Sequence, residues 1–262
     1  MKTRLDAELV RRELARSRES AVELITAGKV LVNGIPATKA ASQVDAQISI
    51  TLKDDQAEFV SRGGHKLAGA LDHFSSLEVA GKVALDAGAS TGGFTDVLLK
   101  RGVKKVIAAD VGYGQLAWQL QSDERVKILD RVNVRSLTKE QVGEEIDLVV
   151  ADLSFISLKL VLPALIAVAK ENADFLIMVK PQFEVGKDRL GAGGVVRDAT
   201  LRKEAVVSVA DAAFALGLGC LGVVASSLPG PSGNVEYFLW LSKAGQALLE
   251  VDLDLAIEKG PA

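Results

Sequence analysis

The stretch Leu85-Asp-Ala-Gly88-Ala-Ser90-Thr-Gly92-Gly93-Phe94-Thr-Asp96 decides the fold. It leads from a short apolar run through small residues into a segment of helical character around 93–101. Open α/β sheets bind ligands at such turns, where the carboxyl end of a strand passes into a helix. The glycines let a ligand approach the backbone closely, and Ser90 brings a hydroxyl to the start of the helix, where a carboxylate can bind. We therefore expect a cofactor loop here.

The same pattern continues on the C-terminal side of this loop. Short apolar runs alternate with helical segments, which indicates a doubly wound, mainly parallel α/β sheet. We expect seven strands, the last inserted antiparallel as in class I, Rossmann-like methyltransferases. The predicted strands are 83–85, 106–109, 126–129, 148–151, 175–179, 221–225 and 237–241, and the predicted helices lie around 93–101, 115–122, 138–142, 158–170 and 200–216.

The spacing of the loop separates two kinds of cofactor. A dinucleotide fingerprint needs glycine at its first, third and sixth positions, but counting from Gly88 the third position is Ser90. Counted from Asp86, the loop resembles the S-adenosylmethionine loop of class I methyltransferases. Acids at the ends of the first three strands suit the methionine amine, the ribose hydroxyls and the adenine amine. The predicted cofactor-binding residues are Asp86, Gly88, Ser90, Gly92, Gly93, Phe94, Asp110, Asp130 and Asp152.

The ends of the fourth and fifth strands carry Asp152 and Lys180. Adjacent strand ends in this fold open into one cleft, so we expect these side chains to face each other. A ribose hydroxyl must lose its proton as it attacks a sulfonium methyl group. A partly desolvated lysine can take that proton, or stay charged and stabilise the alkoxide, while a carboxylate orients it. Lys66 and Glu236 can complete a catalytic tetrad of two cations and two anions.

The first sixty residues follow a different pattern. Apolar positions at helical spacing predict two short helices, Val30-Leu-Val32 meets the turn signal Asn33-Gly34, and 47–50 forms one more strand. Residues 1–40 hold eight Lys and Arg against five Asp and Glu, a surplus of three positive charges in a chain of net charge −3. An RNA backbone would meet this end first. The predicted RNA-binding residues are Arg4, Arg11, Arg12, Arg16, Arg18 and Lys29.

Two resemblances sharpen these expectations. Arg4-Leu-Asp, Leu14-Ala-Arg-Ser-Arg18, Gly28-Lys-Val30 and Val32-Asn-Gly34 resemble the RNA-binding domain named after small-subunit ribosomal protein four. Arg62-Gly-Gly-His-Lys66, the cofactor loop, Ala151-Asp-Leu-Ser-Phe-Ile-Ser157, Val179-Lys-Pro-Gln-Phe-Glu184 and Asn234-Val-Glu-Tyr237 resemble the TlyA, or haemolysin A, family, with an FtsJ-like catalytic half.

The second resemblance implies an enzyme that transfers a methyl group from S-adenosylmethionine to a cytidine 2′-hydroxyl of ribosomal RNA, in the small or large subunit. It places the FtsJ-type Lys-Asp-Lys-Glu tetrad on Lys66, Asp152, Lys180 and Glu236. We therefore expect a small α+β RNA-binding domain over 1–60. A methyltransferase domain should cover 61–262, with its linker in 54–66. The glycine-rich segment 186–198 is interpreted as a lid, or alternatively as a plain surface loop.

Composition limits the setting of this activity. No apolar run reaches signal-peptide length at the N-terminus or the roughly 18 residues that cross a bilayer, so a cytoplasmic protein without membrane contact is expected. The two histidines have no partners at metal-ligand spacing, and we predict no metal. The oligomeric state stays open between monomer and homodimer.

Three rival interpretations have distinguishing features. Transfer to a base nitrogen is suggested by Asp152-Leu-Ser-Phe155, which loosely resembles an Asp-Pro-Pro-Tyr loop but lacks both prolines and gives Lys180 no role. A membrane-lytic haemolysin should have a secretory signal or a long lysine-rich amphipathic helix. A catalytically silent RNA-binding factor could lose tetrad residues, and all four are present. Ribose methylation fits best.

Overall fold

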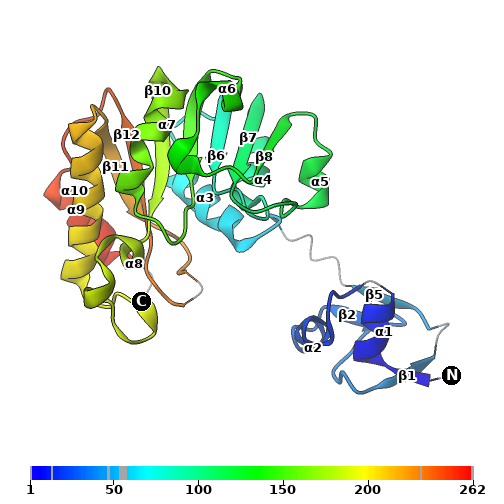
Figure 1. The fold of residues 1–262 in the computed structure, drawn as a ribbon. Coiled ribbons are helices and arrows are strands. Elements are labelled where there is room, and N and C mark those ends of the chain that lie inside the picture. Colours follow the sequence, from blue (N-terminus) through cyan, green and yellow to red (C-terminus); the bar gives the residue numbers. More distant parts are fainter. Residues whose placement is uncertain (1, 13, 46–47, 53–57, 231, 261–262) are drawn as a thin grey trace. The chain divides into compact units, whose positions relative to one another are not determined.

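The computed structural model describes residues 2–12, 14–45, 48–52, 58–230 and 232–260. The chain forms two compact units, Met1–Glu58 and Phe59–Ala262, which are described separately (Figure 1). The predicted boundary after residue 60 lies two residues beyond this division. Gln47, where a strand was expected to begin, and linker positions 54–57 lie outside the described residues.

The first unit packs two helices on short strands. Its core contains mainly aliphatic residues from α1, α2 and the strands, including Leu5, Leu9, Ile25, Val30 and Ile50. The expected turn joins β2 to β3 with φ of 51° at Asn33 and 79° at Gly34, which suits a tight hairpin. A pairing of β1 with β4 was not expected from the sequence. The elements are β1 (Lys2–Arg4), α1 (Leu5–Arg11), α2 (Arg18–Thr26), β2 (Val30–Val32), β3 (Ile35–Pro36), β4 (Gln43–Asp45) and β5 (Ile50–Leu52).

The second unit is built on a seven-stranded sheet of order β11-β12-β10-β9-β6-β7-β8. Among these described strands β12 alone runs opposite in direction to the other six, since it pairs antiparallel with both β10 and β11. The predicted class I methyltransferase fold with an antiparallel last strand is therefore confirmed. The strands are β6 (Val83–Ala87), β7 (Lys105–Asp110), β8 (Val126–Asp130), β9 (Ile146–Ala151), β10 (Ala169–Val179), β11 (Gly219–Ala225) and β12 (Tyr237–Ser242).

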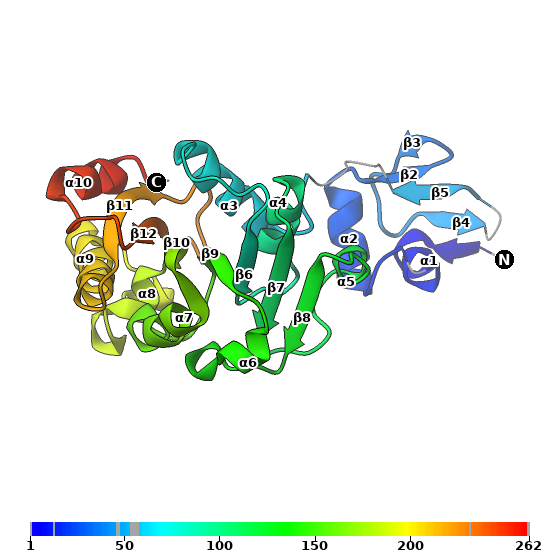
Figure 2. The same cartoon turned by 90° about the horizontal axis from the view of Figure 1, so that it is seen from above.

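Helices cover both faces of this sheet, with α3 and α4 on one side and α6 and α7 on the other (Figure 2). The longest, α9, packs on β10, β11 and β12. None of the helices within the described residues combines the length and apolar character needed to cross a membrane. The helices are α3 (Arg62–His73), α4 (Gly93–Lys100), α5 (Trp118–Gln121), α6 (Lys139–Val142), α7 (Leu162–Val168), α8 (Pro181–Glu184), α9 (Ala199–Ala215) and α10 (Glu250–Glu258), with 3₁₀ turns η1 (Val134–Ser136), η2 (Leu158–Leu160), η3 (Lys187–Arg189) and η4 (Ala192–Gly194).

Alternation along the strands divides the interior into two cores. Val149 and Ala151 of β9 point into the core beneath α7 and α9, whereas Leu148 and Val150 point into the core beneath α3 and α4. Successive side chains of a strand face opposite sides, so each central strand must be apolar throughout. This burial fixes the register of the strands. The register in turn sets the positions of the residues that follow each strand at the edge of the sheet.

Candidate active site

Two cavities open near the carboxyl ends of the parallel strands, and the loop after β9 contributes to both. One cavity of about 420 Å³ is lined by Gly88, Ser90, Asp110 and Asp152, among others. The other, of about 710 Å³, includes Lys180 and Glu236 in its lining. The shared wall consists of Ser154, Phe155 and Ile156. Groups bound in the two cavities would thus meet across one short loop.

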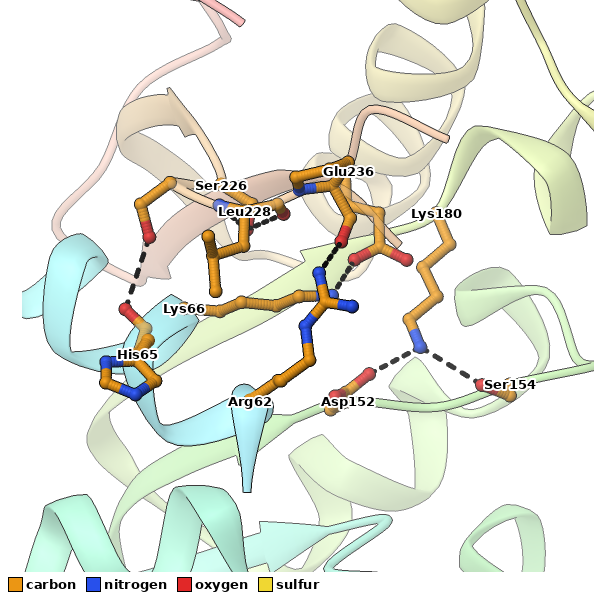
Figure 3. A network of polar contacts seen from close by, with 11 residues as sticks. Arg62, His65, Lys66, Asp152, Ser154, Lys180, Ser226, Leu228 and Glu236 are labelled. Atoms are coloured by element: carbon orange, nitrogen blue, oxygen red, sulfur yellow. Dashed lines mark hydrogen bonds and ion pairs between the residues drawn. The ribbon is translucent and has the colours of Figure 1, made fainter. Parts of the chain in front are cut away.

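Asp152 and Lys180 form an ion pair at this junction. Nζ of Lys180 lies 2.5 Å from Oδ1 of Asp152 and donates a hydrogen bond of 3.0 Å to Oγ of Ser154 (Figure 3). Lys180 follows the last residue of β10 and is the N-cap residue of α8, which begins at Pro181. The lysine side chain is about one-tenth exposed, so a neighbouring anion matters for keeping its charge in this setting. The expectation that these two strand ends face each other agrees with this distance.

Lys66 and Glu236 form a second, more deeply buried pair. Lys66 comes from α3 and Glu236 precedes β12, and Nζ of Lys66 donates to Oε2 of Glu236 at 2.5 Å. The two side chains are only 8% and 1% exposed, so each charge depends on the other. Figure 3 shows both pairs in one close view, and Lys180 and Glu236 line the same cavity. The four predicted catalytic residues are thus brought to one place as two ion pairs.

A backbone turn supports Glu236 from the other side. The peptide N–H of Ser226 donates to the carbonyl of Glu236 at 2.7 Å, and Oγ of Ser227 donates to the carbonyl of His65 at 3.2 Å. Arg62, in the first turn of α3, reaches the carbonyl of Pro229 at 3.3 Å. These contacts join α3 to the loop before β12, so Lys66 and Glu236 are held from both of their elements.

The glycines of the cofactor loop have different environments. Gly88 has φ +87°, and a Cβ there would lie 2.6 Å from the carbonyl oxygen of Asp152. Gly92 faces Leu116 and Leu120, and a Cβ on Gly93 would lie 2.3 Å from Oγ of Ser61. Only Gly88 lines the cofactor-side cavity, so the other two glycines allow close packing of α4.

Two further predicted residues lie away from that cavity. Phe94 stacks on Phe238 inside the core, with ring centroids 6.0 Å apart. Oδ2 of Asp130 accepts the N–H of Gly114 at 3.0 Å and is not part of the cavity lining. Asp130 thus shapes the rim loop after β7.

Asp86 and Asp110 differ sharply in surroundings. Asp86 is fully buried, and Thr95 donates to its Oδ2 at 2.7 Å, while Oδ1 has no partner within the described part of the chain. Burial raises the pKa of Asp86 to about 7, the hydrogen bond from Thr95 opposes this rise, and the negative charge of Asp152 adds to it. Asp110 accepts the backbone N–H groups of Ser90 at 2.8 Å and Gly112 at 2.7 Å. Asp110 therefore folds the cofactor loop and keeps lone pairs for a ligand.

Sequence and structure comparisons agree with this geometry. The FtsJ-like methyltransferase family matches residues 59–243, and the S4 domain family matches residues 3–47. The 16S/23S rRNA (cytidine-2′-O)-methyltransferase TlyA of Mycobacterium tuberculosis H37Rv is 57% identical, over 99% of both chains. The chain belongs to the TlyA family. The family assignment, the methyltransferase class and the dependence on S-adenosylmethionine that were predicted from the sequence are thereby confirmed.

Solved structures support the same assignment. A proposed hemolysin from Streptococcus thermophilus superposes with a TM-score of 0.77 at 34% identity, covering 98% of this chain and 95% of its own. A proposed S-adenosylmethionine-dependent methyltransferase from Listeria monocytogenes gives a TM-score of 0.51 at 13% identity, covering 68% and 99%. The latter likeness concerns the fold alone.

The residues of this TlyA family member fit S-adenosylmethionine. The unpartnered Oδ1 of Asp86 suits a bound amine, since a buried polar atom without a partner is costly. The open space at Gly88, which a side chain would fill, gives the ligand access to the loop. Asp110 can receive ribose hydroxyls in the same cavity. The site offers the cofactor a place for its cationic end and for its sugar.

The predicted RNA-binding cations lie in the first unit, which corresponds to the S4 part of the family. Arg4, Arg11, Arg16 and Arg18 are exposed, whereas Arg12 and Lys29 are half-buried. Several of the arginines are engaged by acidic residues of their own unit, with Arg4 2.8 Å from Asp6 and Arg11 2.6 Å from Glu8. The six cations therefore do not form a uniform surface.

Sequence reasoning missed two residues, Glu184 and Asn234, that hold the loops around this site. Glu184 accepts the hydroxyl of Ser157 at 2.6 Å and the N–H of Leu158 at 2.8 Å, which joins α8 to the loop after β9. Burial raises the pKa of Glu184, and these hydrogen bonds oppose the rise. Glu184 is part of the quoted motif Val179-Lys-Pro-Gln-Phe-Glu184. Its role in holding the loop after β9 is visible only from its hydrogen-bond partners.

The glycine-rich segment is attached to the site by one side chain. Buried Asn234 accepts the N–H of Val196 at 2.9 Å and donates to the carbonyl of Gly194 at 3.1 Å. Val196 packs with Val185 in a small apolar cluster. The segment is thus hydrogen-bonded to the loop that precedes β12 and carries Glu236. Whether it opens and closes as a lid stays a prediction.

Proposed function

We propose that this protein transfers the methyl group of S-adenosylmethionine to the 2′-hydroxyl of a cytidine in ribosomal RNA. The observation that carries the proposal is the ion pair of Lys180 and Asp152, which stands where the Gly88 cavity meets the larger one. The substrate is inferred from relatives that carry this activity in their names, including TlyA of M. tuberculosis. A ribosomal substrate also implies a cytoplasmic site of action.

Each tetrad residue has a defined task in this proposal. When bound, S-adenosylmethionine supplies a methyl group on a positively charged sulfur, open to in-line attack by an oxygen. In the resting ion pair Lys180 carries a proton, which it releases to solvent before the transfer; as the free amine it then takes the proton of the attacking hydroxyl and becomes an ammonium ion again. Asp152, 2.5 Å away, stabilises that ammonium, and Ser154 fixes its direction. The proton therefore has a destination within the chain.

Lys66 and Glu236 orient the acceptor in the same scheme. Glu236 lines the 710 Å³ cavity, and its partner Lys66 lies behind it as a fixed positive charge. A carboxylate at this position can accept a hydrogen bond from a ribose hydroxyl, while its other hydrogen bond, from Lys66, fixes its direction. Phe155, which is 92% exposed, and Phe183 lie 5.2 Å apart between ring centroids and offer aromatic faces for a nucleobase.

Cofactor placement follows from the other cavity. We assign the ribose to Asp110, which lines this cavity with Gly88 and Ser90. We assign the methionine amine to Asp86 on its unpartnered Oδ1, although Asp86 is buried and does not itself line the cavity. Asp152 lines this cavity as well as pairing with Lys180, so it belongs to both halves of the site. Gly92, Gly93, Phe94 and Asp130 shape the surroundings of the cofactor through packing and backbone contacts.

The decisive experiment separates chemistry from cofactor binding. Lys180→Ala should lower the rate of methyl transfer to unmodified ribosomal RNA by roughly 100- to 10,000-fold, the usual effect of losing a general base, with cofactor affinity nearly unchanged. Lys243→Ala is the matched control, since Lys243 is exposed and pairs with Glu171 at the ends of β12 and β10 opposite to those beside Glu236 and Lys180. Mass mapping of the product must locate the methyl group on the sugar. A methylated base, or an active Lys180→Ala variant, would contradict the proposal.

A further inference from the structure

Two acidic side chains are buried in the most positive part of the chain. Asp6 and Glu8, on α1, are 2% and 1% exposed, although acidic residues are almost never fully buried without a partner. Neither belongs to the methyltransferase site, and the sequence analysis assigned a role to neither, although Asp6 stands in the quoted motif Arg4-Leu-Asp. Their partners are arginines that the sequence predicted to bind RNA.

Asp6 holds two arginines from different elements. Arg4, at the end of β1, makes a bidentate contact, with Nε 3.1 Å from Oδ1 and Nη2 2.8 Å from Oδ2. Arg18, at the start of α2, donates from Nη2 to the same Oδ2 at 3.1 Å. The hydrogen bond from Arg4 holds the pKa of Asp6 well below its usual range, so this anchor stays charged. Both arginine side chains are about half exposed, at 45% and 58%.

Glu8 also holds two arginines, but the two differ. Arg11 is bidentate, with Nε 2.8 Å from Oε2 and Nη2 2.6 Å from Oε1, and its side chain is 59% exposed. Arg12 donates from Nε to Oε1 at 2.8 Å and from Nη1 to the carbonyl of Ile48 at 2.8 Å. The Arg12 side chain is 22% exposed, because both edges of its guanidinium face the protein.

We propose that Asp6 and Glu8 are positioning residues that hold Arg4, Arg11 and Arg18 ready for RNA phosphates, while Arg12 fastens α1 to the loop before β5. A guanidinium has five N–H donors in a rigid fork, and the carboxylate uses one edge of it. The remaining donors point away from the anchor and are free to contact phosphate oxygens. The arginine side chains are thus already ordered before RNA binds, which lowers the entropy cost of binding. This inference rests on the proposed RNA substrate.

In the test, positioning and net charge predict opposite changes in RNA affinity. Asp6→Asn removes a negative charge from an RNA-binding surface, so simple electrostatics predicts tighter binding. Loss of positioning predicts weaker binding, by about fivefold to tenfold for two arginines that must then be ordered on association. Glu8→Gln makes the same test independently. The matched control is Asp45→Asn, because Asp45 is exposed on β4 in the same unit.

Binding is measured for the full chain with purified small and large ribosomal subunits and with their deproteinised RNA, over a range of salt concentrations. Circular dichroism and thermal melting confirm that each variant is folded. Weaker binding by folded Asp6→Asn or Glu8→Gln, with binding by Asp45→Asn unchanged or tighter, supports the inference. Equal or tighter binding by folded Asp6→Asn and Glu8→Gln overturns it.

A second measurement decides the role of Arg12 without touching either carboxylate. The salt dependence of binding counts phosphate contacts, with a slope of about 0.7 to 0.9 per contact. Arg11→Gln should reduce the slope by about one contact, and Arg12→Gln should leave it unchanged. Equal losses of slope would refute the division between the two arginines. Absence of salt-dependent binding by the wild-type chain would instead refute the proposed function itself.

Discussion

Acidification should weaken the binding of S-adenosylmethionine, because we assign its amine to the buried carboxylate of Asp86. Burial raises the pKa of this group to about 7 in the free protein. A cation placed beside Oδ1 favours the ionised form and so lowers that pKa again. Below about pH 7, cofactor binding must therefore expel a proton from Asp86. The affinity should fall as the pH falls, since the proton competes with the cofactor.

The size of this effect follows from the shift. If the bound amine returns the pKa of Asp86 to near its ordinary value of 3.8, each pH unit below about 7 weakens binding tenfold, or about 1.4 kcal/mol. Between about pH 8 and about pH 5 the affinity should then drop by on the order of a hundredfold. Above about pH 8 the amine of the cofactor itself loses its proton, so the affinity should be highest at slightly alkaline pH.

Titration calorimetry with S-adenosylhomocysteine, which retains the amine, measures both quantities. Runs at about pH 5, 6 and 7.5, in two buffers of different ionisation enthalpy, give the affinity and the protons released. Asp86→Asn should bind weakly and without pH dependence. Asp72→Asn, which changes an exposed acid paired with Arg101, should keep the full dependence. Equal affinity at about pH 5 and 7.5, or a pH-dependent Asp86→Asn variant, would refute the assignment.

Three other predictions follow from contacts in the two units. Removal of residues 1–58 should weaken binding to ribosomal RNA and flatten its salt dependence while cofactor affinity persists, and filter binding at several salt concentrations checks this. Gly88→Ala should lower cofactor affinity at least tenfold, because its Cβ would lie 2.6 Å from the carbonyl of Asp152. Gly81→Ala, at φ +75° with open space around it, should cost only about 1–2 kcal/mol of stability in a denaturant titration. Glu184→Gln should lower kcat more than the cofactor Kd, because it loosens the loop of Ser157 next to the tetrad, and equal losses in both would contradict this.

The regular part of the fold could be predicted because its physics is local. Strands such as Leu148-Val-Val-Ala151 are apolar throughout since both faces are buried, and that pattern is visible in the sequence. The first half of β10 was missed, because 169–174 is mostly polar: 169–170 was assigned to the helix around 158–170, and 171–174 was assigned to no element. The pairing of β1 with β4 depends on contacts between distant residues, which periodicity does not show.

Helix α3 shows why the site was only partly predictable. Arg62-Gly-Gly-His-Lys66 has the glycines of a linker, yet it forms the first turns of a twelve-residue helix. A Cβ on Gly64 would lie 2.3 Å from Phe59, so the glycine serves close packing. Lys66 and Glu236 could be chosen by resemblance, but their contact, 170 residues apart, required the tertiary structure. The partners of Glu184 and Asn234 were invisible for the same reason.

The placement of Asp152 restricts how this enzyme can evolve. Its N–H donates to the carbonyl of Ala87 at 3.0 Å, its own carbonyl faces Gly88, and its carboxylate pairs with Lys180. One residue thus sets the spacing between the two cavities through one backbone hydrogen bond, one close approach of two backbones and one ion pair. Relatives that act on a different acceptor can vary the outer residues of the larger cavity. The spacing between the two cavities at Asp152 must stay the same.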